Sequence, residues 1–255
     1  MTKIFAVTNQ KGGVGKTTTC INLAASLVAT KRKVLLVDMD PQGHASLGSG
    51  VDKKDLKLSV YDLLMGEASA EDVRLKTDPA GYDLLPANVD LAGAEVNLIN
   101  EPQRERCLAD ALDSIKKEYD FILIDCPPSL NLLTINALTA ARGVLVPVQC
   151  EYYALEGLAS LLDTLKRVAS TVNPGLEVMG ILRTMYDPRT SLTQDVSNQL
   201  TEYFKDQVLG TVIPRNVRLA EAPSYGMPVL SYDAKSKGSL AYLALAGEIL
   251  RRNSL

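Results

Sequence analysis

Two lysines and two threonines near the N-terminus have the types and spacing that phosphate chemistry requires. They lie in Asn9-Gln10-Lys11-Gly12-Gly13-Val14-Gly15-Lys16-Thr17-Thr18. Glycines let successive backbone N–H groups turn inward toward an anion. In such a loop a lysine reaches the β- and γ-phosphates of a nucleotide, and the following hydroxyl holds Mg²⁺. We therefore expect the backbone of 12–15 and the side chains of Lys16, Thr17 and Thr18 to bind ATP and Mg²⁺.

The flanking residues predict the elements that must position this loop. Ile4–Thr8 is a short apolar run with strand character, and 17–29 has the apolar face of a helix. Strand, glycine loop and helix, in that order, form the context of a phosphate-binding loop. The helix N-terminus adds a partial positive charge. An ordinary glycine-rich turn before a helix is the alternative, but it leaves the lysine and the two threonines unexplained.

Lys11 departs from the plain motif G-x-x-x-x-G-K-[ST], because it stands where that motif has its first glycine. From the loop entrance it cannot easily reach the γ-phosphate of its own nucleotide, but it can reach a nucleotide held by a second copy of the chain. The run K-G-G-V-G-K-T-T (11–18) resembles the deviant Walker A motif of the ParA/MinD ATPases. That resemblance implies that Lys11 crosses a dimer interface and acts catalytically on the partner's ATP.

Carboxylates end two further predicted strands. The apolar run from Lys33 ends in Asp38-Met39-Asp40-Pro41-Gln42-Gly43, and Phe121–Ile124 ends in Asp125. The second pattern is that of a Walker B strand, so we expect Asp125 to support the Mg²⁺ site, usually through a water. The resemblance implies that Asp40 orients the attacking water. Acids in a polar strand-to-loop turn remain the alternative for Asp40, and more so for Asp38.

The rest of the chain alternates between predicted strands and helices. We expect strands over 82–86, 143–148, 176–184 and 208–212, and helices over 91–99, 103–117, 129–142, 192–204 and 238–252, with another running through Arg167. We expect residues 44–81 to form polar surface loops with a short helical segment at 60–65, and His44 to be a loop residue. The pattern predicts a single doubly wound α/β domain over 1–255, with a mostly parallel sheet flanked by helices, of the P-loop NTPase type.

Composition favours an ordinary soluble globular protein, with 46% apolar and 22% charged residues. No apolar run approaches the roughly 18 residues of a membrane span, and strand character by Ile4 leaves no room for a signal peptide. The four cysteines are far apart with no C-x-x-C, which favours reduced thiols. We therefore expect a cytoplasmic protein.

Four more segments carry a narrower resemblance. D-M-D-P-Q-G (38–43), I-D-C-P-P-S (124–129), Q-C-E-Y-Y-A-L-E-G (149–157) and V-I-P-R-N-V-R (212–218) are similar to the ParA/Soj chromosome-partitioning ATPases. The resemblance implies an ATP-dependent homodimer that binds DNA without sequence preference and releases it after slow hydrolysis. It also implies nucleoid association and a ParB-type, DNA-bound partner as activator. It places Pro214 and Asn216 near the adenine.

DNA binding by a chain of net charge −3 requires a local basic patch. From 205 to 255 there are seven Lys or Arg against four Asp or Glu, a local charge of +3. We expect Arg218 to be the main contact and, by resemblance, Arg189 the next. Lys235, Lys237 and Arg251 are weaker candidates, for which solvated surface charge is an equal alternative.

Other P-loop functions remain as rivals. A MinD-like positioning ATPase would end in a basic amphipathic helix that lies on a membrane, but the last predicted helix carries only Arg251 and Arg252 at its end. We therefore expect no membrane partner. An iron-protein-like function needs cluster cysteines in a suitable context, which the sequence lacks. Metabolic P-loop enzymes are a further possibility.

Overall fold

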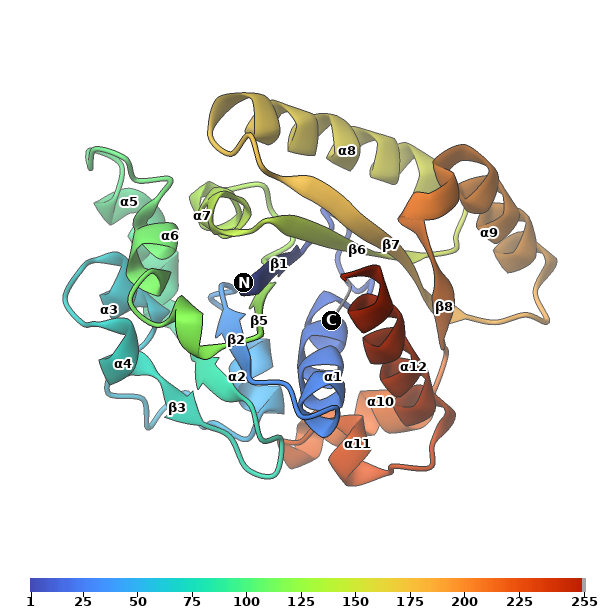
Figure 1. Cartoon of the computed structure of the whole chain (residues 1–255), viewed down its shortest axis with the longest axis horizontal. Coiled ribbons are helices and arrows are strands. Elements are labelled where there is room, and N and C mark those ends of the chain that lie inside the picture. Colours follow the sequence, from blue (N-terminus) through green and yellow to red (C-terminus); the bar gives the residue numbers. More distant parts are fainter. Residues whose placement is uncertain (254–255) are drawn as a thin grey trace.

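The computed structural model describes residues 1–253, and its centre is an eight-stranded sheet of order β3-β4-β2-β5-β1-β6-β7-β8 (Figure 1). Adjacent strands are parallel except for β3 and β4. The predicted doubly wound α/β fold with a mostly parallel sheet is therefore confirmed. The strands are β1 (Lys3–Val7), β2 (Val34–Asp38), β3 (Leu75–Lys76), β4 (Asp83–Leu85), β5 (Phe121–Asp125), β6 (Gly143–Gln149), β7 (Glu177–Tyr186) and β8 (Val208–Pro214).

Helices cover both faces of the sheet, and each face has its own apolar core. Alternation along β1 shows the division, because Phe5 and Val7 point into one core and Ala6 into the other. In Figure 1, α8 lies above the sheet, while α1 and α12 lie side by side below it. The core below receives α1 (Lys16–Ala29), α10 (Val217–Glu221), α11 (Val229–Tyr232) and α12 (Lys237–Arg252). The core above receives α3 (Val60–Leu64), α6 (Cys107–Leu112), α7 (Leu132–Ala140), α8 (Ala154–Thr171) and α9 (Ser191–Phe204).

The register of the central strands brings the chemical groups to one edge. β2 and β5 are buried along their whole length, as continuous apolar runs in a parallel sheet should be. Val7, the last residue of β1, pairs with Asp125, and Asp38 pairs with Asp125 from the other side. The glycine loop and both acidic strand ends therefore meet at the carboxyl edge of the sheet, where ligands bind in open α/β folds.

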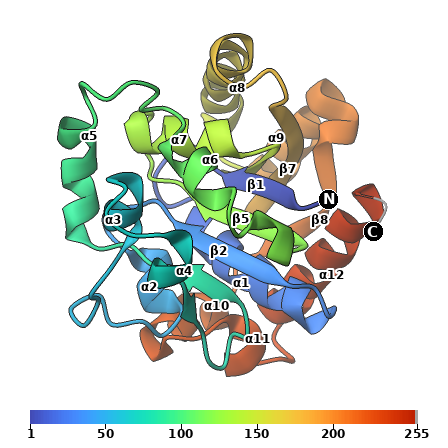
Figure 2. The same ribbon diagram turned by 60° about the vertical axis from the view of Figure 1, so that its left-hand side comes forward.

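The prediction for residues 44–81 is wrong in part, because the segment is not a simple surface excursion. It contains α2 (His44–Gly48), α3 and α4 (Ala70–Val73), and it comes forward in Figure 2. Ala45 and Ser46 are fully buried, and His44 begins a short helix rather than lying in a loop. Capping boxes at Ser59 and Ser69 start α3 and α4.

Several helices are shorter than the sequence pattern predicts. The expected helix over 91–99 is a 3₁₀ turn, η1 (Val89–Gly93), followed by α5 (Ala94–Asn97). The expected helix over 103–117 is reduced to α6 and the 3₁₀ turn η2 (Lys116–Glu118). Two further 3₁₀ turns, η3 (Lys205–Gln207) and η4 (Ala222–Tyr225), and the short helices α10 and α11 have no counterpart in the prediction.

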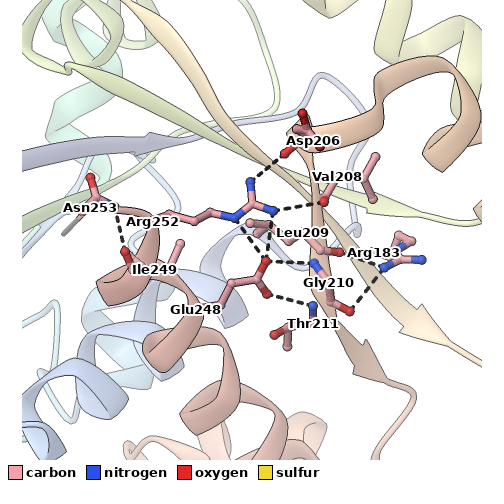
Figure 3. Close-up of polar contacts among 10 residues, drawn as sticks. All are labelled: Arg183, Asp206, Val208, Leu209, Gly210, Thr211, Glu248, Ile249, Arg252 and Asn253. Carbon is pink, nitrogen blue, oxygen red and sulfur yellow. Dashed lines mark hydrogen bonds and ion pairs between the residues drawn. The ribbon is translucent and has the colours of Figure 1, made fainter. Parts of the chain in front are cut away.

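The edge strand β8 is covered by the last helix. The Glu248 carboxylate on α12 accepts hydrogen bonds from the backbone N–H of Gly210 and of Thr211, each at 2.8 Å (Figure 3). Arg252 donates to Glu248 and to the carbonyls of Asp206 and Val208. Burial raises the pKa of Glu248, but the bonds from Thr211 and Gly210 outweigh it, so the pKa lies below the ordinary value. This anchor satisfies edge N–H groups that would otherwise be free to pair with another strand.

Candidate nucleotide site

The glycine loop joins β1 to α1 and is tied to the neighbouring strands. Gly13 (φ +74°) and Gly15 (φ +90°) have left-handed backbones that side chains rarely adopt. Thr184 on β7 donates its hydroxyl to the Val14 carbonyl at 2.8 Å, and Asn9 donates its side-chain amide to the Pro147 carbonyl of β6 at 2.8 Å. These two hydrogen bonds therefore tie the curled loop to β7 and β6.

A cleft of about 780 Å³ opens over this loop, a size suited to a nucleotide. Asp40 lies across the cleft from the loop, and 127–131, the segment after β5, forms another wall. The structure thus brings together the predicted phosphate-binding residues and the predicted water-orienting acid. The lining from the loop and α1 comprises Gly12, Gly13, Gly15, Lys16, Thr17 and Thr18.

Lys16 is buried with only weak compensation for its charge. Its side chain lies at the cleft, the residue is 8% exposed, and Nζ donates to the Lys11 carbonyl over a long 3.4 Å. Within residues 1–253 no carboxylate lies at ion-pairing distance from this ammonium. A buried cation needs a counter-charge, and an anion in the cleft would supply it.

Asp125 is a buried carboxylate whose surroundings suit the binding of a cation. It is fully buried; Oδ1 accepts a 3.6 Å contact from the Cys20 thiol, and Oδ2 has no hydrogen-bond partner. Burial, followed by the charge of Asp38, raises its pKa, and the nearby Thr17 hydroxyl and Lys16 ammonium oppose that rise. A threonine hydroxyl and an unpartnered carboxylate oxygen are hard donors of the kind that Mg²⁺ prefers, so these two residues fit the predicted metal.

Asp38 and Asp40 have different surroundings. Asp38 is fully buried and accepts bonds from the Ser46 backbone at 2.8 Å and hydroxyl at 2.7 Å, which fixes the turn into α2. Burial raises the pKa of Asp38, and the bonds from Ser46 oppose that rise. Asp40 instead lines the cleft, with Oδ1 accepting only from the Gln42 backbone at 2.9 Å. Of the two acids, Asp40 is the one placed to meet a ligand.

A second cavity, of about 240 Å³, adjoins the first, and Gly15, Thr18 and Met185 line both. Pro214 and Asn216 lie in its wall, so the structure groups the two residues expected near a base. The Asn216 side-chain oxygen caps α10 by accepting from Leu219 N at 3.3 Å. Its amide nitrogen is therefore the group that remains for a ligand.

Comparison with known proteins identifies the family. The family model described as an AAA domain matches residues 2–178. The chain is 52% identical to the chromosome-partitioning ATPase Soj of Treponema pallidum over 253 residues, 99% of each chain. It is 51% identical to the chromosome partitioning protein ParA of Caulobacter vibrioides over 252 residues, 98% of this chain and 94% of that protein. This chain belongs to the ParA/Soj family of chromosome-partitioning ATPases.

Solved structures agree with this ParA/Soj assignment in fold. A cobyrinic acid a,c-diamide synthase from Mycobacterium smegmatis, with bound ADP and magnesium, is 41% identical with a TM-score of 0.88, covering 100% of this chain and 96% of that one. The cell division ATPase MinD of Pyrococcus furiosus is 31% identical with a TM-score of 0.82, covering 98% and 99%. The predicted family, P-loop fold and ATPase class are confirmed.

The cations predicted to contact DNA in this ParA/Soj chain come from α10, from both ends of α12 and from two loops. Arg218 on α10 lies between Glu221 at 2.8 Å and Asp233 at 3.3 Å. Lys237 begins α12, and that end of the helix packs against α10, because Gly238 lies against Leu219. Arg251 lies in the last turn of α12, about 21 Å further along the helix axis at 1.5 Å per residue.

The other two candidates lie outside the helices. Lys235 is exposed just before α12. Arg189, in the turn after β7, is 87% exposed and clamps Asp187 through Nε at 2.9 Å and Nη2 at 2.7 Å. Lys237 therefore lies at the end of α12 that packs on α10, and Arg251 lies at the other end of that helix. The turn that holds Arg189 adjoins the segment before α10, because the Arg215 N–H donates to the Tyr186 carbonyl at 3.3 Å.

Three polar residues of the site are missing from the sequence prediction. Thr184 holds the loop, Ser46 holds Asp38, and Glu151 pairs with Lys11 at 2.5 Å. Thr184 and Glu151 lie at or just after the carboxyl ends of β7 and β6. The rule that flagged Asp40 and Asp125, a polar residue at the carboxyl end of a strand, flags both of them as well.

Proposed function

We propose that this ParA/Soj-family ATPase is a switch for chromosome or plasmid partitioning: it binds ATP and Mg²⁺, forms a homodimer in that state, and then binds DNA without sequence preference. Slow hydrolysis, stimulated by a ParB-type partner, releases the DNA. One observation carries the proposal. A single cleft holds Lys16, Thr17 and Asp40, with Lys11 at the entrance to its loop.

Nucleotide binding follows from the charges in the cleft. The phosphates neutralise the buried Lys16 ammonium and accept from the N–H groups of the curled loop at the start of α1. Thr17 and Asp125 are the residues that would hold Mg²⁺, directly or through water. When bound, the metal neutralises charge that develops on the phosphate oxygens. The relatives solved with ADP or an ATP analogue and magnesium support this assignment.

Hydrolysis requires a positioned water and a cation on the far side of the γ-phosphate. Asp40 faces the cleft with free lone pairs, so it can accept a hydrogen bond from a water and orient it for attack. Lys11 is at the loop entrance, and at 47% exposure its side chain can reach into a facing molecule. In a two-fold dimer each Lys11 would approach the partner's phosphates, as an arginine finger does.

DNA binding would then depend on the dimer. The chain is net acidic, so a single basic group around Arg218 attracts DNA weakly, and two such groups on one dimer attract it more strongly. Contacts to phosphates carry no base information. Binding should therefore tolerate any sequence and fall steeply with salt.

Membrane attachment through α12 is less well supported. Its Tyr242, Leu245 and Ile249 are at most 1% exposed, because they pack in the core between α12 and the sheet. An interfacial helix would need this apolar face free. No helix within residues 1–253 is long and apolar enough to span a bilayer.

The deciding experiment measures DNA binding with ATP, with ADP and without nucleotide, on a random duplex at low salt. We expect retention only with ATP, together with dimers by light scattering. Liposome pelleting runs in parallel, with vesicles containing anionic lipid. Equal DNA binding in all three nucleotide states would overturn the switch. Pelleting with vesicles but no DNA binding would favour a MinD-like role, and neither activity would favour a metabolic role such as that named for the M. smegmatis relative.

A further inference from the structure

Lys11 is held by an acid of its own chain. Its Nζ lies 2.5 Å from Oε2 of Glu151, and the two side chains are 47% and 46% exposed. Glu151 lies two residues after the end of β6, so the pair joins the entrance of the glycine loop to the turn between β6 and α8. Nothing in the proposed nucleotide chemistry uses this carboxylate.

Hydrogen bonds to neighbouring residues position both partners of the ion pair. Lys11 donates its N–H to the Asn9 side chain at 3.0 Å, and Asn9 is tied to β6 through the Pro147 carbonyl. Glu151 donates its N–H to the Gln149 carbonyl at 2.8 Å and accepts from Ala154 N at 2.9 Å. Both ends of the ion pair are thus anchored to the same strand, and the pair needs little further ordering to form.

The neighbourhood of the pair indicates what covers it. Tyr152 and Tyr153, next to Glu151, form an edge-to-face pair and are 75% and 70% exposed. Adjacent exposed aromatics are a feature of protein interfaces. They lie beside the lysine that would cross to a second copy, so the occupant that fits this face is another molecule of the same chain.

Because one ammonium cannot stay on Glu151 and also neutralise a partner's phosphates, the two contacts compete. We propose that Glu151 is a latch that holds Lys11 within its own protomer in the nucleotide-free monomer, and that ATP-dependent dimerisation opens it. The proposal rests on the dimerisation proposed above and adds the residue that opposes it. Glu151 thereby raises the concentration of ATP-bound protein that is needed for dimers to form.

Lys16 links the latch to the nucleotide. Its Nζ donates to the backbone carbonyl of Lys11, at 3.4 Å. Phosphates bound in the cleft would compete with that carbonyl for the Lys16 ammonium, and the Lys11 backbone would then have one contact fewer. Glu151 is then the remaining restraint on its side chain, and the facing γ-phosphate displaces it.

The expected size of the effect follows from exposure. Half-exposed ion pairs contribute about 0.2–1 kcal/mol, which is about 1.4- to 5-fold in an equilibrium constant. A two-fold dimer opens two latches, so the dimer dissociation constant should change by about 2- to 30-fold. Such a latch tunes the threshold for dimerisation and does not block it.

The test compares Glu151→Gln with Glu156→Gln, both in Asp40→Ala protein to limit hydrolysis. Glu156 is an exposed acid in the first turn of α8, so the control has the same charge change away from Lys11. With ATP and Mg²⁺, sedimentation should show the Glu151→Gln dimer to be tighter by at least 2-fold and the Glu156→Gln dimer to be unchanged. An unchanged or weaker Glu151→Gln dimer overturns the latch, because Glu151 would then be neutral or part of the interface.

A second measurement needs neither ATP nor a dimer. Amine labelling of the nucleotide-free monomer, followed by mass spectrometry of the Lys11 peptide, should be faster in Glu151→Gln than in Glu156→Gln. Equal labelling shows that Glu151 does not restrain Lys11 and sinks the latch by itself. If labelling differs while the parent protein fails to dimerise with ATP, the proposed switch fails, and the restraint on Lys11 stands without its regulatory role.

Discussion

Asp38 and Asp125 are register partners on adjacent parallel strands, and both are fully buried at the carboxyl ends of β2 and β5. The carboxyl of Asp38 is satisfied by Ser46, whereas Oδ2 of Asp125 has no partner. The two carboxyls therefore lie in the same low-dielectric environment, but only that of Asp38 has hydrogen bonds that stabilise its charged form. Ionising both without a cation costs free energy, and burial is the first cause of the raised pKa of each.

This pair predicts the pH dependence of the nucleotide-free protein. A carboxyl whose pKa is higher in the folded than in the unfolded state contributes stability at low pH, and that contribution is lost as the pH rises through the folded value. Asp125→Asn removes the titration, so it should stabilise the metal-free protein by about 1–3 kcal/mol at pH 8.5 and by less at pH 5. Thermal denaturation across pH checks this, with exposed Asp195→Asn as the control. An equal gain at both pH values would contradict it.

Asp40 should be needed for chemistry more than for binding. Asp40→Ala removes the acid that faces the cleft but leaves Lys16, Thr17 and the loop intact, so ATP affinity should stay within a few-fold. Turnover should fall by about 10²-fold or more, and the ATP-bound dimer should accumulate. Calorimetric titration, a phosphate-release assay and light scattering measure the three effects. Lys16→Ala, in contrast, should lose nucleotide binding, because no other lysine or arginine among residues 1–253 lines the cleft.

The glycines of the loop should separate dimerisation from nucleotide binding. An added Cβ at Gly12 meets nothing within 4 Å in the monomer, and its φ is not positive. Gly12→Val should therefore fold and bind ATP but fail to dimerise, because in the proposed dimer the added side chain would collide with the facing loop. Gly15→Val forces a branched side chain into φ +90° and should lose ATP binding itself. Lys11→Ala should likewise bind ATP but fail to dimerise. If either variant dimerises with wild-type affinity, the dimer interface lies elsewhere.

Much of this site could be predicted from local sequence, because parallel strands carry their own signal. Continuous apolar runs ending in Asp38 and Asp125 identify buried strands and the edge at which they finish. The sequence does not reveal which acid is engaged, since that depends on Ser46 in a helix of five residues. The partner of Lys11 is 140 residues away, and only the strand order β1-β6 brings Glu151 beside it.

The short helices were the least predictable part of the fold. α10 and α11 have too few residues for a helical period, and they form because Asn216 caps one and the core takes Leu219 and Val229. Charge counting found a basic C-terminal segment, but it could not show that Glu221 and Asp233 both contact Arg218.

Glu248 should contribute to stability through the strand that it covers (Figure 3). Glu248→Ala leaves the N–H groups of Gly210 and Thr211 without their acceptor, which should cost about 1–3 kcal/mol. Because the pKa of Glu248 is lowered by folding, its contribution is present above the ordinary carboxyl value and is lost as the pH falls. Urea unfolding at pH 7 and pH 4 checks both statements, with exposed Glu202→Ala as the control. A variant as stable as the control would show that water replaces the carboxylate.

Arg218 gives the sharpest test of the DNA surface, because its charge is already shared with Glu221 and Asp233. Arg218→Glu should abolish DNA retention and leave ATP-dependent dimerisation unchanged. Arg218→Ala should lower the salt dependence of binding by about two phosphate contacts per dimer, one for each protomer. Glu221→Gln should do the reverse and tighten DNA binding, since it frees the guanidinium.

Lys166→Glu is the matched control, because Lys166 is 79% exposed and paired with Asp163 on α8, across the sheet. Gel shifts over a salt series measure all four variants. If Arg218→Glu still binds, or if Lys166→Glu is the variant that fails, then DNA is contacted by the α8 face and not by α10.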